Sequence, residues 1–225
     1  ADGFRSGGTL DVDEPWIDDA RRYYINIVGK YGAQVQALLK KATALDIRMI
    51  CPLHGPILKE NLDYYLEKYR IWSSYFPEED GILIVSASIH GHTAKAAQIF
   101  ADILQSKGAP SVRVADLCRG DMAEIIGEAF RYSKLVTACA TYNGALFPCM
   151  ESFLSQIRLK NFQKRTVGII ENGSWAPMAG KLMRTSFEDM KDLVIVEPTV
   201  TIKSTVNSSA LSQMEELANA LLAQN

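Results

Sequence analysis

Hydroxyl-bearing residues and a glycine follow a short apolar run in the stretch Ile82-Leu-Ile-Val-Ser-Ala-Ser-Ile-His-Gly-His-Thr93. The apolar run predicts a buried strand over 82–85, and the residues after it predict a helix that begins at about Thr93. Backbone N–H groups, the positive end of the helix dipole and several hydroxyl groups would then surround one concavity, which suits a phosphate monoester. The candidate ligand-binding residues of this loop are Ser86, Ser88, Ile89, His90, Gly91, His92 and Thr93.

Two common phosphate motifs do not match this loop. It has no lysine or arginine and therefore lacks the Gly-Lys-Ser/Thr end of a nucleotide P-loop. It also lacks the G-x-G-x-x-G spacing of a dinucleotide site. Serine, threonine and glycine after a strand often serve only as turn and helix-capping residues, so this loop alone does not decide between the two interpretations.

Two further loops carry polar and aromatic side chains. The stretch 140–148 offers Thr141, Tyr142, Asn143 and Gly144, and the stretch 171–177 offers Asn172, Gly173, Ser174 and Trp175. Each aromatic side chain taken alone is more often a packing residue than a ligand contact. At one edge of a parallel sheet, however, the three loops together would fit a cofactor with a phosphate tail and a large planar head, as FMN has.

The elements that must position these loops alternate between strand and helix five times. The strands are predicted over 82–85, 111–115, 135–140, 166–170 and 193–196. The helices are predicted over 93–106, 121–130, 148–157, 177–190 and 208–222. Such repeats predict an α/β fold with a flavodoxin-like, five-stranded, doubly wound parallel sheet. A response regulator shares that topology but needs clustered acidic residues after the first strand, where this chain has Ser86-Ala-Ser88.

The residues before the sheet have a different pattern. Helices are predicted over 15–28, 32–45 and about 62–72, with one short strand over 47–50. This is too little for an independent core, so we interpret 1–75 as the truncated end of another domain. The predicted division is therefore 1–75, a linker over 76–81, and a cofactor-binding domain over 82–225.

Composition excludes several classes of protein. A net charge of −2 gives no indication of a nucleic-acid partner, and no apolar run approaches the length of a membrane span. The four cysteines, Cys51, Cys118, Cys139 and Cys149, have no zinc-finger or C-x-x-C spacing, so a reduced cytoplasmic protein is expected. Because the sequence begins with Ala-Asp-Gly-Phe, without methionine, we expect a piece of something longer.

The three loops resemble those of the flavodoxin domain of flavodiiron proteins, also called A-type flavoproteins. The resemblance lies in Ser88-x-His90-Gly91-x-Thr93, Thr141-Tyr-Asn-Gly144 and Asn172-Gly-Ser-Trp175. Upstream, Pro52-Leu-His-Gly-Pro56 resembles the last metal-ligand segment of their metallo-β-lactamase-like domain. The opening Ala1-Asp-Gly-Phe4 resembles the start of the segment whose aspartate bridges two irons.

The resemblance implies FMN in the three loops and, in the intact protein, a di-iron centre with Asp2 and His54 among its ligands. It implies reduction of O₂ to water or of NO to N₂O, a redox donor such as rubredoxin or a flavin reductase, and a head-to-tail homodimer. The family's H-x-E-x-D-H ligand run is absent from this sequence, so this chain is expected to hold no complete metal site.

Other departures and alternatives stay open. His90 and His92 stand where the family more often has an aromatic residue and asparagine, and the third loop differs from the usual Gly-Trp-Ser-Gly. For His54, a structural role before Pro56 is an alternative to metal ligation. The alternative function is a flavodoxin-like electron carrier without catalysis of its own, and a hydrolase remnant is a third hypothesis.

Overall fold

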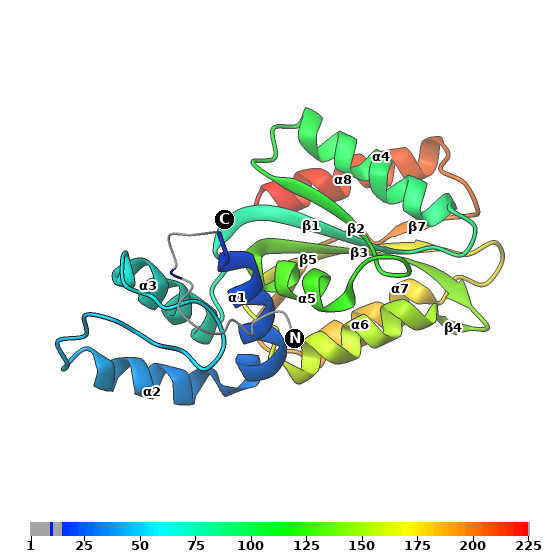
Figure 1. Cartoon of the computed structure of the whole chain (residues 1–225). Coiled ribbons are helices and arrows are strands. Elements are labelled where there is room, and N and C mark those ends of the chain that lie inside the picture. The colour runs from blue at the N-terminus through cyan, green and yellow to red at the C-terminus, as the bar shows by residue number, and fades with distance from the viewer. Residues whose placement is uncertain (1–9, 11–14, 225) are drawn as a thin grey trace.

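The computed structural model describes Leu10 and residues 15–224. Its centre is a seven-stranded sheet whose main path runs β2-β1-β3-β5-β6 (Figure 1). The strands are β1 (Glu79–Ala87), β2 (Val112–Asp116), β3 (Tyr132–Tyr142), β4 (Ala145–Leu146), β5 (Arg165–Asn172), β6 (Leu193–Ile195) and β7 (Val200–Ile202). The pairs along the main path are all parallel, whereas β4 pairs antiparallel with β3.

The predicted flavodoxin-like sheet is confirmed, with one difference at its edge. The order of the parallel strands is that of a doubly wound sheet, in which the direction of strand addition reverses between β1 and β3. The predicted fifth strand is β6, which pairs with β5 at Arg165–Val167. A further short strand that was not predicted, β7, pairs with β5 at Ile170–Asn172. The two short strands therefore occupy one edge position in succession.

Helices cover both faces of the sheet. On one face lie α4 (His92–Ser106) and α8 (Ser208–Leu222); on the other lie α5 (Met122–Arg131), α6 (Pro148–Leu159) and α7 (Ala179–Glu188) (Figure 1). Two separate apolar clusters fill the space between the sheet and these layers. Since β1 and β3 are covered on both faces, their central residues are nearly all apolar and fully buried.

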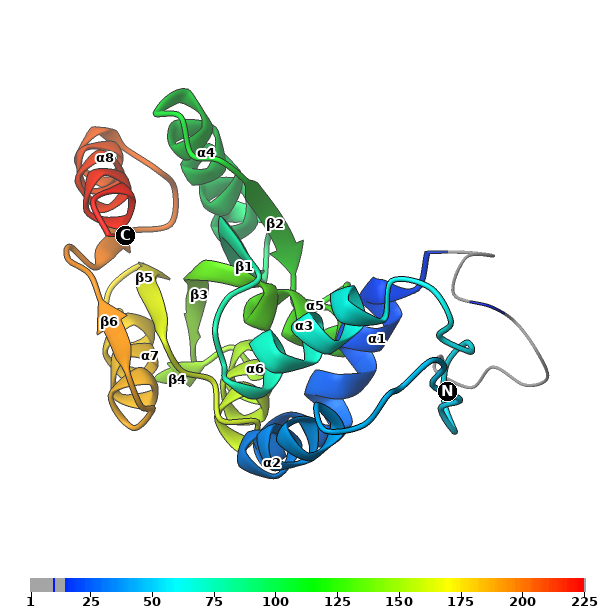
Figure 2. The ribbon, with the colours of Figure 1, turned by 90° about the vertical axis from the view of Figure 1, so that its left-hand side faces the viewer.

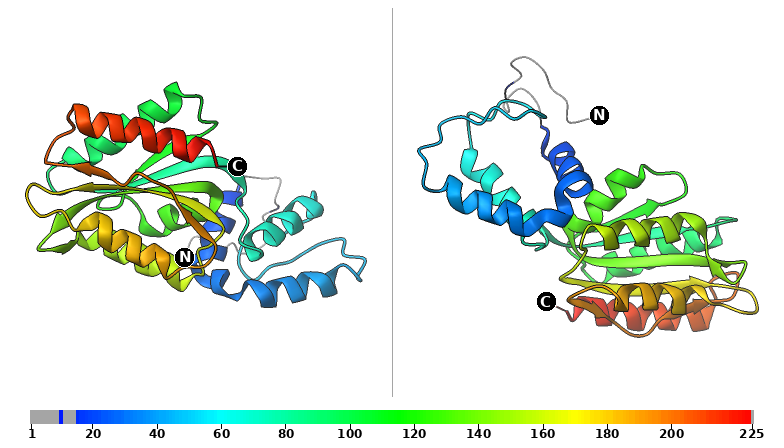
Figure 3. Two further views of the ribbon diagram at one scale, coloured as in Figure 1. Left: turned by 180° about the vertical axis from the view of Figure 1, so that it is seen from behind. Right: turned by 90° about the horizontal axis from the view of Figure 1, so that it is seen from below.

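The N-terminal segment forms a helical extension at one side of the sheet (Figures 2 and 3). It consists of α1 (Ile17–Tyr23), a π-helical turn η1 (Tyr24–Val28), a 3₁₀ turn η2 (Gly29–Tyr31), α2 (Gly32–Ala42) and α3 (Leu62–Ser73). The strand predicted over 47–50 is wrong. Only Ile50 pairs, in a single bridge to Leu58, because no strand among the described residues runs beside this stretch to extend the ladder.

The extension and the sheet share one apolar core. Tyr24 and Trp72 are at most 2% exposed and pack with their rings 5.4 Å apart. They belong to the same buried cluster as Leu83 of β1 and Phe153 of α6. In addition, β1 begins at Glu79, inside the segment predicted to be a linker. The division into domains therefore stays a proposal.

A buried carboxylate marks the junction between the extension and the sheet. The side chain of Glu78 has no exposed surface and forms an ion pair with Arg21. It also accepts hydrogen bonds from Lys68 Nζ at 2.9 Å and from Trp72 Nε1 at 2.6 Å. Burial by itself raises the pKa of Glu78, but the hydrogen bond and charge of Arg21, helped by Lys68 and Trp72, lower this pKa below its ordinary value.

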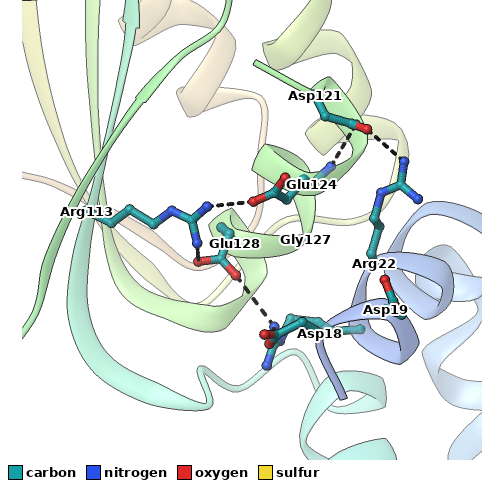
Figure 4. A pocket seen from close by; sticks show the side chains of 9 residues that line it. Asp18, Asp19, Arg22, Arg113, Asp121, Glu124, Gly127 and Glu128 are labelled. Atoms are coloured by element: carbon teal, nitrogen blue, oxygen red, sulfur yellow. Dashed lines mark hydrogen bonds and ion pairs between the residues drawn. The ribbon is translucent and has the colours of Figure 1, made fainter. Parts of the chain in front are cut away.

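A charged pocket of about 410 Å³ lies beside this junction, between α1 and α5 (Figure 4). Arg113 of β2 bridges Glu124 and Glu128 at 2.6 and 2.8 Å, and Arg22 reaches Asp121 at 2.9 Å. The Arg22–Asp121 pair joins α1 to the start of α5, and the two Arg113 pairs join β2 to α5. Because none of the lining residues belongs to the three candidate loops, this pocket is separate from the predicted cofactor site.

Candidate functional site

The loop after β1 closes with a tight turn at Gly91. The Gly91 N–H donates to Ser88 Oγ at 3.0 Å, so the buried Ser88 side chain shapes the turn. Gly91 has φ +89°, which an L side chain rarely adopts. A Cβ added there would meet no atom within 4 Å, so the space in front of the turn is open.

The N-terminus of α4 opens into that space. Gly91 is the N-cap residue and supplies no side-chain acceptor, whereas α5 is capped by Asp121 and α8 by Asn207. The first N–H groups of any α-helix have no partner within the helix, and the helix dipole adds partial positive charge there. His92, the first residue of α4, is exposed beside these groups, as is His90. This geometry suits an anion.

Other predicted phosphate contacts are buried and take part in hydrogen bonds within the protein. Ser86 Oγ donates to the Ala115 carbonyl of β2 at 3.5 Å. Thr93 is 2% exposed, and its Oγ1 accepts a hydrogen bond from Asn172 Nδ2 at 3.3 Å. Ile89 is half-buried at the rim of the loop. The structure thus places Ser86 and Thr93 beneath the turn and Ile89 at its side.

Asn172 joins the first loop to the third. Besides its bond to Thr93, its side chain donates to the Ser204 carbonyl at 3.0 Å and accepts from the Ser204 N–H at 3.0 Å. Its amide therefore fixes three segments of chain at the carboxyl edge of the sheet. Asn172 was predicted as a ligand residue, which stays a prediction; in the structure its side chain positions the surrounding segments.

The second loop is a two-residue hairpin between β3 and β4. Asn143 and Gly144 have φ +50° and +72°, and the flanking residues Tyr142 and Ala145 pair across the turn. Asn-Gly between paired strands is a strong hairpin signal, and the sequence analysis did not predict a hairpin here. The hairpin holds Tyr142 half-exposed, with its ring edge-on to Phe147 at 5.5 Å.

Thr141 ties the second loop to the third. Its Oγ1 accepts hydrogen bonds from the Met178 and Ala179 N–H groups at 3.0 and 3.1 Å. Thr141, which belongs to β3, thus caps the N-terminus of α7. Thr141 was predicted as a ligand contact, which also stays a prediction; in the structure its hydroxyl group accepts two hydrogen bonds that position the start of α7.

Replacing Thr141 with valine tests this positioning role. We expect Thr141→Val to lower the free energy of unfolding by about 1–2 kcal/mol, because two N–H groups at the start of α7 lose their acceptor. Urea denaturation followed by circular dichroism measures this change. Thr141→Ser, which keeps the hydroxyl, is the control and should unfold close to the wild-type midpoint. Equal stability of the valine variant would contradict the capping role.

The third loop presents Trp175 to solvent. Trp175 is 94% exposed, and Ser174 beside it is also exposed, whereas Gly173 lies against Pro177. A tryptophan this exposed contributes nothing to the core, so the alternative interpretation as a packing residue does not hold for the structure. An exposed indole at this edge offers a flat surface for a planar ligand.

One buried residue at the floor of the site was missed by the sequence analysis. Glu171 is 9% exposed and accepts hydrogen bonds from the Gly180 N–H at 2.8 Å and from Thr201 Oγ1 at 2.9 Å. It orients the start of α7 and β7. A carboxylate at the end of an otherwise apolar strand was the available signal, since such a group needs buried partners.

The two residues predicted as iron ligands are Asp2 and His54. Asp2 lies outside the residues that the structure describes. His54 is half-buried, and its ring lies 5.3 Å from that of Tyr23. Within the described part of the chain, no group of three histidine, cysteine or acidic side chains is arranged to hold a metal ion. Nor does any helix in that part have the length and apolar character of a membrane span.

The sheet order and the three loops define a flavodoxin-like α/β fold. Its structural neighbours are flavodiiron proteins, which confirms the predicted resemblance. Rubredoxin oxygen:oxidoreductase from Desulfovibrio gigas has a TM-score of 0.87 at 19% identity, over 96% of this chain and 55% of that one. The flavodiiron protein of Giardia intestinalis has a TM-score of 0.86 at 19% identity, over 99% of this chain and 57% of that one.

Sequence comparison points the same way. An anaerobic nitric oxide reductase flavorubredoxin of Aliivibrio fischeri is 27% identical over 169 residues, which are 73% of this chain and 34% of that protein. No protein-family model matches the chain. The chain spans between a third and just over half of the length of these relatives.

Proposed function

We propose that this chain is an FMN-binding electron-transfer module. The observation that carries the proposal is the joint arrangement of three loops at the carboxyl ends of β1, β3 and β5. They combine an uncapped helix N-terminus, a hairpin with a half-exposed tyrosine and a fully exposed tryptophan. The buried bonds from Thr93 to Asn172 and from Thr141 to the start of α7 hold these loops together before any ligand binds.

Each loop has a separate role in this proposal. Ser88 and Gly91 shape the turn that presents the α4 N–H groups to the phosphate, and Thr93 closes the floor of that concavity. Asn143 and Gly144 hold backbone groups at the ring edge, while Tyr142 and Trp175 offer flat surfaces to the ring. FMN supplies reversible one- and two-electron chemistry when bound, and the residues around it position it and limit solvent access.

The larger proposal concerns the intact protein. We infer that this module passes electrons to a di-iron centre that reduces O₂ to water or NO to N₂O, with a donor such as rubredoxin. The names of the relatives, a rubredoxin oxygen:oxidoreductase and a nitric oxide reductase flavorubredoxin, support this inference. A cytoplasmic location, a homodimer and iron ligation by Asp2 and His54 belong to the same proposal.

An anaerobic titration of the purified chain with FMN tests the first proposal. We expect saturable one-to-one quenching of flavin fluorescence with a shifted flavin absorbance spectrum. Riboflavin, which lacks the phosphate, should bind much more weakly. Equal affinity for FMN and riboflavin would show that the phosphate does not contribute to binding. Absence of binding by either flavin would overturn the proposal.

Replacing Trp175 with alanine tests the contribution of the indole. We expect Trp175→Ala to raise the Kd for FMN by roughly 2- to 12-fold, because ring stacking typically contributes about 0.5–1.5 kcal/mol beyond buried area. Trp175→Phe keeps a flat ring and should retain most of the affinity. Since Trp175 packs on nothing in the protein, neither variant should alter the unfolding midpoint. An unchanged Kd in the alanine variant would remove Trp175 from the site.

A further inference from the structure

The turn between β7 and α8 has a strained backbone. The Thr205 N–H donates to the Lys203 carbonyl at 3.0 Å, and Ser204 between them has φ +71°. A hydrogen bond across three residues with a positive central φ defines a γ-turn of the rare, strained type. A residue with a side chain disfavours this conformation, which persists only where the surrounding structure holds it, and such positions gather at ligand sites.

The side chain of Asn172 holds this turn in place. It accepts a hydrogen bond from the Ser204 N–H and donates one to the Ser204 carbonyl, both at 3.0 Å. The same amide donates to Thr93 Oγ1 at 3.3 Å, and Thr93 is the second residue of α4. One buried side chain therefore connects the γ-turn directly to the helix N-terminus at which the phosphate is proposed to bind.

The strands and helices around the turn place it at the same edge of the sheet. Because β1 and β7 run in the same direction within the sheet, the segments that follow them lie at the same edge. The helices that these segments lead into, α4 and α8, lie together on one face of the sheet (Figure 1). The N-terminus of α8 is capped by Asn207, whereas that of α4 is open.

Lys203 is the only lysine or arginine in the segments that would surround the cofactor. These segments follow β1, β3, β5 and β7 and comprise 88–91, 143–147, 173–178 and 203–207. They also contain no aspartate or glutamate. Lys203 is exposed, and no carboxylate among the described residues forms an ion pair with it. Lys95, which is exposed three residues after the start of α4, is an alternative cation on the helix itself.

A bound phosphate needs more positive charge than the end of α4 provides. A phosphate monoester carries nearly two negative charges at neutral pH, whereas a helix N-terminus is equivalent to roughly half a positive charge. Lysine is a compact point charge on a flexible stem and is a common ligand of phosphate. The γ-turn and the Asn172 amide fix the point from which the stem of Lys203 starts, so its ammonium group can reach an anion held beside Thr93.

We propose that the turn 203–205 is a fourth loop of the cofactor site, in which Lys203 binds the phosphate of FMN. The inference rests on the proposed FMN-binding function and adds the residue that makes the site selective for a phosphorylated flavin over riboflavin. Asn172 is then a positioning residue, because its amide holds the turn that carries Lys203.

Replacing Lys203 with glutamine tests the proposal. In fluorescence titrations at low ionic strength, we expect Lys203→Gln to raise the Kd for FMN by roughly 3- to 10-fold, because one charge contact with the phosphate is lost. The Kd for riboflavin should not change. Lys203→Arg keeps the charge and should retain most of the affinity for FMN. Salt at about 1 M screens such charges and should remove most of the difference between the wild-type chain and the glutamine variant.

Two matched variants complete the experiment. Lys191→Gln removes another exposed charge, from the turn between α7 and β6 at the opposite edge of the sheet, and should bind FMN like the wild-type chain. Lys95→Gln removes the alternative cation and should have a smaller effect than Lys203→Gln.

Three outcomes would overturn the assignment of Lys203 and leave the proposed function standing. They are wild-type affinity for FMN in Lys203→Gln, an equal loss of affinity for FMN and riboflavin in that variant, and a loss confined to Lys95→Gln. Absence of FMN binding by the wild-type chain would instead overturn the proposed function, and this inference with it.

Discussion

Replacing His92 with glutamate is expected to raise the Kd for FMN on the order of 100-fold. His92 is the first residue of α4 and is exposed, so the new carboxylate would lie beside the open N–H groups. Two like charges about 4 Å apart repel by about 1–4 kcal/mol between bulk water and the protein surface, and a phosphate monoester carries nearly two charges. Fluorescence titration of the variant at low ionic strength measures the loss.

The same substitution has a built-in control for folding. A carboxylate in the first turn of a helix interacts favourably with the helix dipole, typically by about 0.3–1 kcal/mol. The glutamate variant should therefore unfold no earlier than the wild-type chain, so weaker binding would not reflect a damaged protein. His92→Gln removes the imidazole without adding charge and should bind FMN nearly normally. Wild-type affinity in the glutamate variant would mean that the phosphate does not lie at α4.

Replacing Glu78 with glutamine is expected to lower the free energy of unfolding by about 3 kcal/mol at neutral pH. The substitution keeps the shape of the side chain but removes the charge that compensates the buried Arg21 guanidinium. Breaking a buried ion pair typically costs about 3–5 kcal/mol, and the exposed Asp18, 2.7 Å from Arg21, offsets part of the loss. Urea denaturation at neutral pH measures the difference.

The pH dependence of this difference follows from the lowered pKa of Glu78. Because the folded-state pKa lies below the unfolded value, the stabilisation is fully present above the unfolded pKa and is lost as pH falls through the folded pKa. The difference in the free energy of unfolding between wild type and Glu78→Gln should therefore become smaller in acid, below about pH 4.3. Glu67→Gln, which breaks an exposed pair with Arg70, should cost under about 1 kcal/mol at any pH. A difference in unfolding free energy that stays constant down to about pH 2 would contradict the lowered pKa of Glu78.

The sequence predicted the parts of the fold that depend on local pattern. The apolar runs of β1, β3 and β5 are buried on both faces, and their apolar residue types alone predict buried strands. The last helix, Ser208–Leu222, has the predicted bounds because Asn207 caps its start. The prediction of a strand over 47–50 was wrong because an apolar run forms a strand only beside a partner strand. Whether a partner strand is present depends on the tertiary structure.

For the candidate site, residue types indicated which loops to consider but not the hydrogen bonds that their side chains make. Thr141 and Asn172 carry groups that suit a ligand, yet both bind backbone groups of other segments, a use that depends on contacts between residues over 30 positions apart. Trp175, by contrast, was predicted from its type and loop position; its side chain is exposed, and its contact with a ligand stays a prediction.

The shared apolar core of Tyr24, Trp72 and Phe153 also determines how the chain opens. A core that is continuous across the extension and the sheet links their unfolding, since neither part can expose its face without exposing the other. Amide hydrogens in the middle of α3 and of β1 should therefore exchange with solvent through the same rare global opening. The helical extension, although it protrudes from the sheet, would behave as part of one cooperative unit.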